Sequence, residues 1–67
     1  MYKDCNDLPV GESATAFYSA KNRPLSDDKW YIFCMGADDI KTQIAISVNN
    51  PSTVLRRTYN KTWNDWE

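Results

Sequence analysis

The chain has 67 residues, with eight basic side chains, nine acidic side chains and no histidine. A domain this small buries only about 60% of the surface that its unfolded chain exposes, so it needs aromatic packing or another source of stability. The near-neutral, scattered charge gives no basic footprint for nucleic acid. The absence of histidine excludes Ser-His-Asp and Cys-His catalysis and the commonest transition-metal ligand, so we expect no cofactor. No apolar run approaches the ~20 residues that span a bilayer, so we expect no membrane insertion.

Cys5 and Cys34 are the two cysteines of the chain. A disulfide between them would close a loop of about 30 residues and add about 3–4 kcal/mol in the chain-entropy model. The other interpretation is a pair of buried free thiols that pack as small hydrophobic groups. Because Met1–Asp4 lacks the apolar stretch of a secretory signal, the sequence favours free thiols.

The first 29 residues combine turn signals with one predicted strand. Asn6–Gly11 is rich in turn residues, and a short helical turn over Asp4–Leu8 would have to end before Pro9. Ser13–Ala20, rich in Thr, Phe, Tyr and small residues, predicts the first strand. Lys21–Lys29 is mostly polar and contains a proline, so it predicts a surface loop.

The middle of the chain predicts two strands joined by a hairpin. Trp30–Met35 is apolar on both faces, which indicates a strand in the middle of the sheet or beneath a covering loop. Gly36–Asp39 is typical of a tight hairpin connection. Along Lys41–Val48, apolar side chains alternate with small or polar ones, the pattern of a half-buried strand. The residues predicted to face the core are Ile44, Ile46 and Val48.

The C-terminal third predicts a turn followed by a hairpin. Asn49–Ser52 is a turn sequence, and Val54–Tyr59 predicts a strand. Trp63–Trp66 predicts a last strand, in which the two tryptophans, three residues apart, would face opposite sides of the sheet.

These elements predict a mostly β fold, a small antiparallel sheet of four to five short strands with a turn-rich N-terminal segment. We expect residues 1–67 to form one small β-rich domain. One sheet of this size needs cover on its second face, from the N-terminal segment, the loop at residues 21–29 or another chain.

The candidate functional residues are carboxylates in loops and aromatic side chains near the C-terminus. The pairs Asp27-Asp28 and Asp38-Asp39 could bind a cation or act as acid and base, but the spacing of a calcium loop is absent, so we expect no metal and read them as solvated turn residues. The rings of Tyr59, Trp63 and Trp66, beside Asn64, have two interpretations: core or interface packing, or a platform for a sugar.

Four stretches of the chain resemble a known family. They are Asp4–Pro9, Asn22–Pro24, Thr42–Ile46 and the ending LRRTYN…WNDW over Leu55–Trp66. They are similar to the pyocin-knob-type modules of bacteriophage tail fibres, tail spikes and R-type pyocins. The resemblance is most specific in the ending, although Leu55 stands where the family often has an aromatic residue.

The resemblance implies a non-enzymatic module of a virion tail fibre or tail spike that contributes to receptor binding and host attachment. It implies a homotrimer within a longer fibre, of which this chain would be a fragment, and a bacterial surface glycan as partner. Arg57, Tyr59, Trp63 and Trp66 are carried over as structural motif positions. The candidate receptor-binding residues lie mainly in the loops: Asn22, Asp27, Asp28, Asp38, Asp39 and Asn64.

Two other functions remain open at this point. The chain could be a free-standing, phage-encoded inhibitor that binds a host protein with one face of its sheet. It could also be a carbohydrate-binding module of a cell-wall enzyme. The reading frame that surrounds the segment distinguishes the inhibitor from a fibre module.

Overall fold

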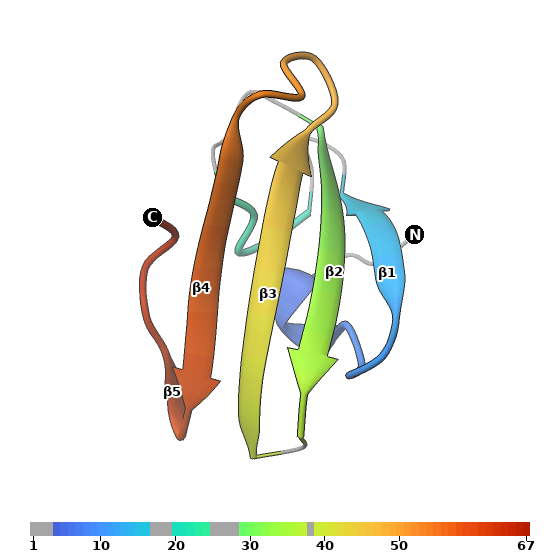
Figure 1. Cartoon of the computed structure of the whole chain (residues 1–67). Coiled ribbons are helices and arrows are strands. Elements are labelled where there is room, and N and C mark those ends of the chain that lie inside the picture. Colours follow the sequence, from blue (N-terminus) through green and yellow to red (C-terminus); the bar gives the residue numbers. More distant parts are fainter. Residues whose placement is uncertain (1–3, 17–19, 25–28, 38) are drawn as a thin grey trace.

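The computed structural model describes residues 4–16, 20–24, 29–37 and 39–67. These residues form an antiparallel meander in which every strand pairs with its neighbours in the sequence, in the order β1-β2-β3-β4-β5 (Figure 1). Four strands have four to eight residues and the fifth has two, which confirms the predicted mostly β fold. The strands are β1 (Ser13–Ala16), β2 (Trp30–Gly36), β3 (Ile40–Ser47), β4 (Val54–Asn60) and β5 (Thr62–Trp63).

A short 3₁₀ helix, η1 (Cys5–Asp7), lies against the back of the sheet in Figure 1. The Asp4 side chain caps it by accepting a hydrogen bond from the Asn6 backbone at 2.9 Å, and Leu8 is already extended before Pro9. The predicted helical turn and its end are therefore confirmed. Because Cys5 and Leu8 are both buried, η1 supplies part of the cover for this face, called the inner face below.

The inner face of the sheet carries the core. Its largest fully buried side chain is that of Trp30, and Ile32 and Cys34 continue the same side of β2. Cys5 and Cys34 are both buried free thiols, as the sequence favours, and burial raises the pKa of the Cys5 thiol. The buried hydrophobic residues are Cys5, Leu8, Ala16, Ala20, Trp30, Ile32, Cys34 and Ala45.

The orientation predicted for β3 is wrong. Gln43, Ala45 and Ser47 are buried on the inner face, whereas Ile44 and Ile46 are only partly buried on the other face. The short or polar side chains face inward because η1 lies close to β3, where the Gln43 amide donates to the carbonyl oxygen of Cys5 at 2.7 Å. A large aliphatic side chain at position 43 would displace this contact.

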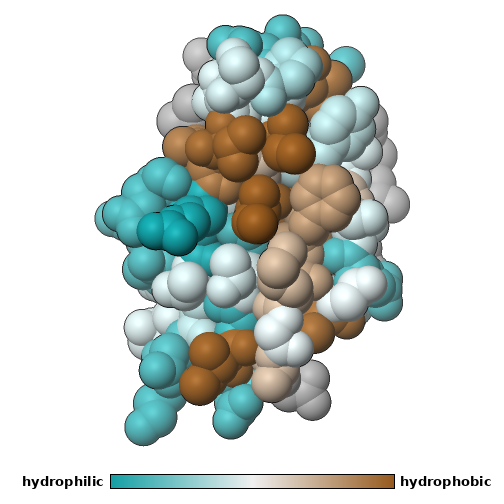
Figure 2. Space-filling model, in the orientation of Figure 1, coloured by the Kyte–Doolittle hydropathy of each residue, from teal (hydrophilic) through white to brown (hydrophobic). Residues whose placement is uncertain are grey.

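The opposite side of the sheet is called the outer face, and no described segment covers it. β2 lies between β1 and β3, as its two apolar sides predict, yet its outward side chains Tyr31, Phe33 and Met35 are 40–47% exposed. Figure 2 shows apolar atoms gathered on this face over β2 and β3. The fold therefore buries one side of a sheet that is apolar on both.

The predicted connections between the strands are largely confirmed. At the β2–β3 hairpin, Gly36 has φ +118°, and a Cβ atom there would lie 2.5 Å from the carbonyl oxygen of Ile40. The turn over Asn49–Ser52 is closed by the bond from the Thr53 backbone to the Asn50 carbonyl at 2.9 Å. The predicted strand Ser13–Ala20 ends at Ala16, and residues 17–19 lie outside the described residues.

Candidate functional site

The C-terminal segment differs from the predicted strand over Trp63–Trp66. β5 has only two residues, Thr62 and Trp63, and follows a tight turn at Lys61, where φ is +70°. Residues 64–67 then return beside β4, and Glu67 exchanges two 2.9 Å backbone hydrogen bonds with Arg56 (Figure 1). Trp66 is therefore not a strand residue, and the alternation rule does not place its ring.

Both tryptophan rings contact the same cation. The guanidinium carbon of Arg57 lies 3.9 Å from the ring centroid of Trp63 and 4.6 Å from that of Trp66. Tyr59 packs beside Trp63, with ring centroids 5.1 Å apart at an interplanar angle of 53°. The expectation that the two tryptophans would lie on opposite sides is wrong, because the chain leaves β5 directly after Trp63.

Arg57 also joins a hydrogen-bonded network on the inner face. Its Nε and Nη2 atoms donate to Gln43 Oε1 at 3.0 and 2.8 Å, and Nη2 donates to Asn6 Oδ1 at 2.8 Å. The exposed fraction of Arg57 is only 4%, and burial lowers the pKa of its guanidinium. These residues, the Arg57 cluster, are Asn6, Gln43, Arg57, Tyr59, Trp63 and Trp66.

The Arg57 cluster is chemically a structural element. Its cation is bound by neutral acceptors and stacked on two rings, so it offers no free charge to a ligand. Asn6 and Gln43 are the members that the sequence did not indicate. Asn6 lies in a turn-rich segment, and the place of Gln43 in an alternating strand predicted exposure to solvent. A lone amide directly before an isoleucine gives no signal of its buried partner.

Asn22, a candidate receptor-binding residue, connects the two ends of the described chain. Its backbone carbonyl accepts a 2.9 Å hydrogen bond from the Trp66 indole, and its side chain donates to Asp4 Oδ1 at 2.8 Å. The hydrogen bonds from Asn22 and from the Asn6 backbone lower the pKa of Asp4. Asn22 holds these contacts at φ +60°, a conformation that asparagine tolerates.

The structure places the other candidate residues in three different situations. Asn64 is bound to β4, since its Oδ1 accepts from the Thr58 backbone at 2.6 Å. Asp27, Asp28 and Asp38 lie outside the described residues. Asp39 is exposed in the β2–β3 connection.

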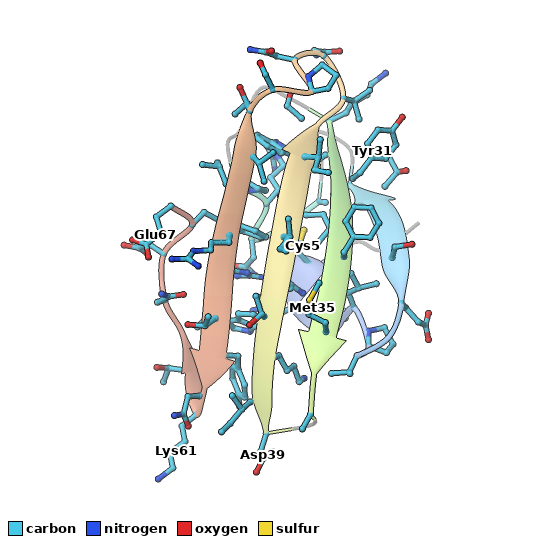
Figure 3. The ribbon with its side chains drawn as sticks, viewed as in Figure 1. Cys5, Tyr31, Met35, Asp39, Lys61 and Glu67 are labelled. Carbon is cyan, nitrogen blue, oxygen red and sulfur yellow. The ribbon has the colours of Figure 1, made fainter. Side chains whose placement is uncertain are left out.

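Asp39 lies at the same end of the sheet as Lys61 (Figure 3). Ile40 pairs with Asn60 across β3 and β4, so the residues just beyond that pair come from two neighbouring turns. All four are exposed, and 57% of Ile40 is accessible. This surface, called the hairpin end, consists of Asp39, Ile40, Asn60 and Lys61, and offers an acceptor, two donors and an apolar contact.

The described residues form no pocket and no cluster of three metal-ligating side chains. No helix among them is long and apolar enough to cross a membrane. Two exposed surfaces of the described residues, the hairpin end and the outer face, carry side chains that could contact a ligand.

Comparison with protein families, with curated proteins and with solved structures finds no match for this chain.

Proposed function

We propose that the chain is a non-enzymatic module of a bacteriophage tail fibre or tail spike in the virion, where it contributes to attachment to the bacterial surface. The observation that carries the proposal is the Arg57 cluster. The four residues on which the resemblance is most specific, Arg57, Tyr59, Trp63 and Trp66, meet in one packed group that joins β4 to the C-terminal segment. Motif residues that pack against one another maintain the fold and do not bind a ligand directly. This role agrees with a structural module.

The hairpin end is the part of the described surface best suited to a glycan. Asp39 can accept hydrogen bonds from sugar hydroxyl groups, and Lys61 and Asn60 can donate them. The exposed Ile40 side chain can pack against the apolar C–H groups of a sugar ring. Such a shallow site binds weakly, and three linked copies would raise the apparent affinity by about 10²–10⁴ without any new contact.

Cell binding tests this proposal. The chain is fused to a trimerising coiled coil, labelled with a fluorophore and titrated onto a panel of bacterial strains, and onto the same cells after removal of their surface polysaccharide. We expect saturable binding to at least one strain, its loss after polysaccharide removal, and at least tenfold weaker binding of the Asp39→Ala, Lys61→Ala double variant. Asp65→Ala, which changes an exposed carboxylate in the C-terminal segment, is the matched control. Absence of binding to every strain would count against the proposal.

A second candidate is a free-standing inhibitor that binds a host protein with one face of its sheet. The uncovered, apolar outer face favours it. The length of the natural reading frame separates the two functions, since a frame that ends at Glu67 contradicts the fibre module and a long frame contradicts the inhibitor.

A further inference from the structure

The outer face carries a compact apolar patch on β2, β3 and β4. The strand pairings align Tyr31, Ile46 and Val54 in one row across the sheet, and Phe33 and Ile44 in the next row. Figure 2 shows apolar atoms gathered over β2 and β3 at this place. The residues of the apolar patch are Tyr31, Phe33, Met35, Ile44, Ile46 and Val54.

Polar side chains border the apolar patch on two sides and limit its size. On β1, Ser13 and Thr15 face outward beside it, and toward the hairpin end Thr42 and Thr58 follow it. The patch is therefore three strands wide, about 10 Å from β2 to β4, and about 13 Å long over the outward residues of β2. An α-helix is about 10–12 Å in diameter and rises about 1.5 Å per residue, so one helix of about nine residues covers the patch.

Arg56 is the charged residue of this surface. It pairs with Ile44 in the second row, and it lies on β4 between Val54 and Thr58. Arg56 is exposed, and among the described residues its guanidinium has no hydrogen-bond or ion-pair partner. A molecule that covers the apolar patch also removes water from Arg56, and a buried cation without a partner is costly. The occupant therefore has to present a carboxylate to Arg56.

Two other occupants fit this surface less well. A second copy of the chain brings a second Arg56, and none of the described outward residues of β1 to β4 is acidic. A sugar needs hydrogen-bonding groups around the ring on which it stacks, whereas Phe33 lies between Ile44 and Met35. The apolar and aromatic composition instead resembles the core of an interface between two different proteins.

We propose that the outer face binds one amphipathic α-helix of a partner protein, whose apolar stripe covers the patch and whose aspartate or glutamate pairs with Arg56. A helix packed on the face of a sheet is a common layer arrangement, and apolar residues at helical spacing form a stripe of the required shape. The planar guanidinium of Arg56 can donate two parallel hydrogen bonds to a carboxylate. This interface does not depend on binding of a glycan at the hairpin end.

Selection from a peptide library tests the proposal. The library displays single helices of about four turns with randomised surface positions, and it is selected for binding to the 67-residue chain. We expect the selected peptides to combine an apolar stripe with an acidic residue beside it, and to bind with Kd of about 1–100 µM in calorimetric titration. Tyr31→Ser should weaken this binding at least about tenfold. Tyr31 is 47% exposed, so the variant should stay folded, which circular dichroism checks.

Charge reversal tests the role of Arg56. Arg56→Glu should weaken binding of a selected peptide at least about tenfold, and arginine in place of the acidic residue of the peptide should restore the affinity to within about threefold. A general effect of Arg56→Glu on the fold would not be reversed by a change in the peptide. Lys21→Glu reverses an exposed charge next to η1 and is the matched control, which should bind as the unchanged chain does.

The proposal is overturned if no helical peptide is selected, if the selected peptides lack an acidic residue, or if Tyr31→Ser and Arg56→Glu leave their binding unchanged. Self-association of the chain that Tyr31→Ser abolishes would also overturn it, because a second copy would then be the occupant. The cell-binding experiment changes Asp39 and Lys61 at the hairpin end. The attachment function and this interface can therefore fail independently.

Discussion

Arg57 donates two hydrogen bonds to a single oxygen atom of Gln43, from Nε at 3.0 Å and from Nη2 at 2.8 Å. The two residues are register partners on β3 and β4, and both are buried. The Gln43 amide also donates a hydrogen bond to the carbonyl oxygen of Cys5 in η1. The Arg57 guanidinium contacts the rings of Trp63 and Trp66. One polar network therefore connects the N-terminal helix, the sheet and the C-terminal segment.

Gln43→Leu should destabilise the fold by about 2–4 kcal/mol, because it leaves the buried Arg57 cation without two of its acceptor contacts and the Cys5 carbonyl without a donor. Urea unfolding followed by tryptophan fluorescence measures the change. Thr42→Val, on the outer face of the same strand, is the control and should lie within about 0.5 kcal/mol of the unchanged chain. Equal effects of the two substitutions would show that the network contributes nothing.

Arg57→Lys should cost about 2 kcal/mol or more, although it preserves the charge. An ammonium group cannot donate the paired hydrogen bonds of the guanidinium fork and cannot stack flat on two rings. The tryptophan emission spectrum should also shift as Trp63 and Trp66 lose their shared contact. Arg56→Lys changes the neighbouring, exposed arginine and is the control. If Arg56→Lys altered the emission spectrum as strongly as Arg57→Lys, the contact of Arg57 with the two tryptophan rings would be contradicted.

Gly36→Ala should destabilise the chain more than Gly11→Ala. Both glycines have positive φ, +118° and +86°, so alanine is strained at either position. At Gly36 the added methyl group would also lie 2.5 Å from the Ile40 carbonyl oxygen, whereas at Gly11 no atom lies within 4 Å. We expect about 1 kcal/mol at Gly11 and at least about 3 kcal/mol at Gly36 by urea unfolding. The reverse order would contradict the hairpin geometry.

The Asp4 carboxylate should stabilise the folded chain near neutral pH, and this stabilisation should be lost in acid. Its pKa in the folded chain is below the ordinary value of 3.8, mainly because its carboxylate accepts a hydrogen bond from the Asn22 side chain. A lowered folded pKa means that the stabilisation is present above the unfolded pKa and disappears as pH falls from about 4 through the folded pKa. In urea unfolding between pH 6 and pH 2, Asp4→Asn should show a smaller loss of stability than the unchanged chain. If the free energies of unfolding of both chains fell equally with pH, Asp4 would not stabilise the fold in this way.

The local elements could be predicted from the sequence, because periodicity, proline and glycine act over a few residues. Pro9 ends η1, Gly36 marks the hairpin, and the apolar run from Trp30 gives β2. The inward side of β3 could not be predicted, because Gln43 is held there by Cys5 and Arg57, two partners that are distant in the sequence.

The candidate site was also predictable only where a local pattern decides the position of a residue. Asp39 is exposed in its turn as a local pattern indicates. Asn22 and Asn64 are instead hydrogen-bonded to segments that are distant or folded back. The ring of Trp66 reaches Arg57 because the residues after Trp63 leave the regular strand and still run beside β4. Such long-range partners leave no periodic signal.

The most direct test of the attachment function is an NMR titration of the isotopically labelled chain with purified surface polysaccharides from the strains that bind it. We predict that the backbone amide chemical shifts of Asp39–Lys41 and Asn60–Thr62 change on titration. The indole N–H signals of Trp63 and Trp66 should not move. Shifts confined to those two indole groups, or no shift with any polysaccharide, would contradict it.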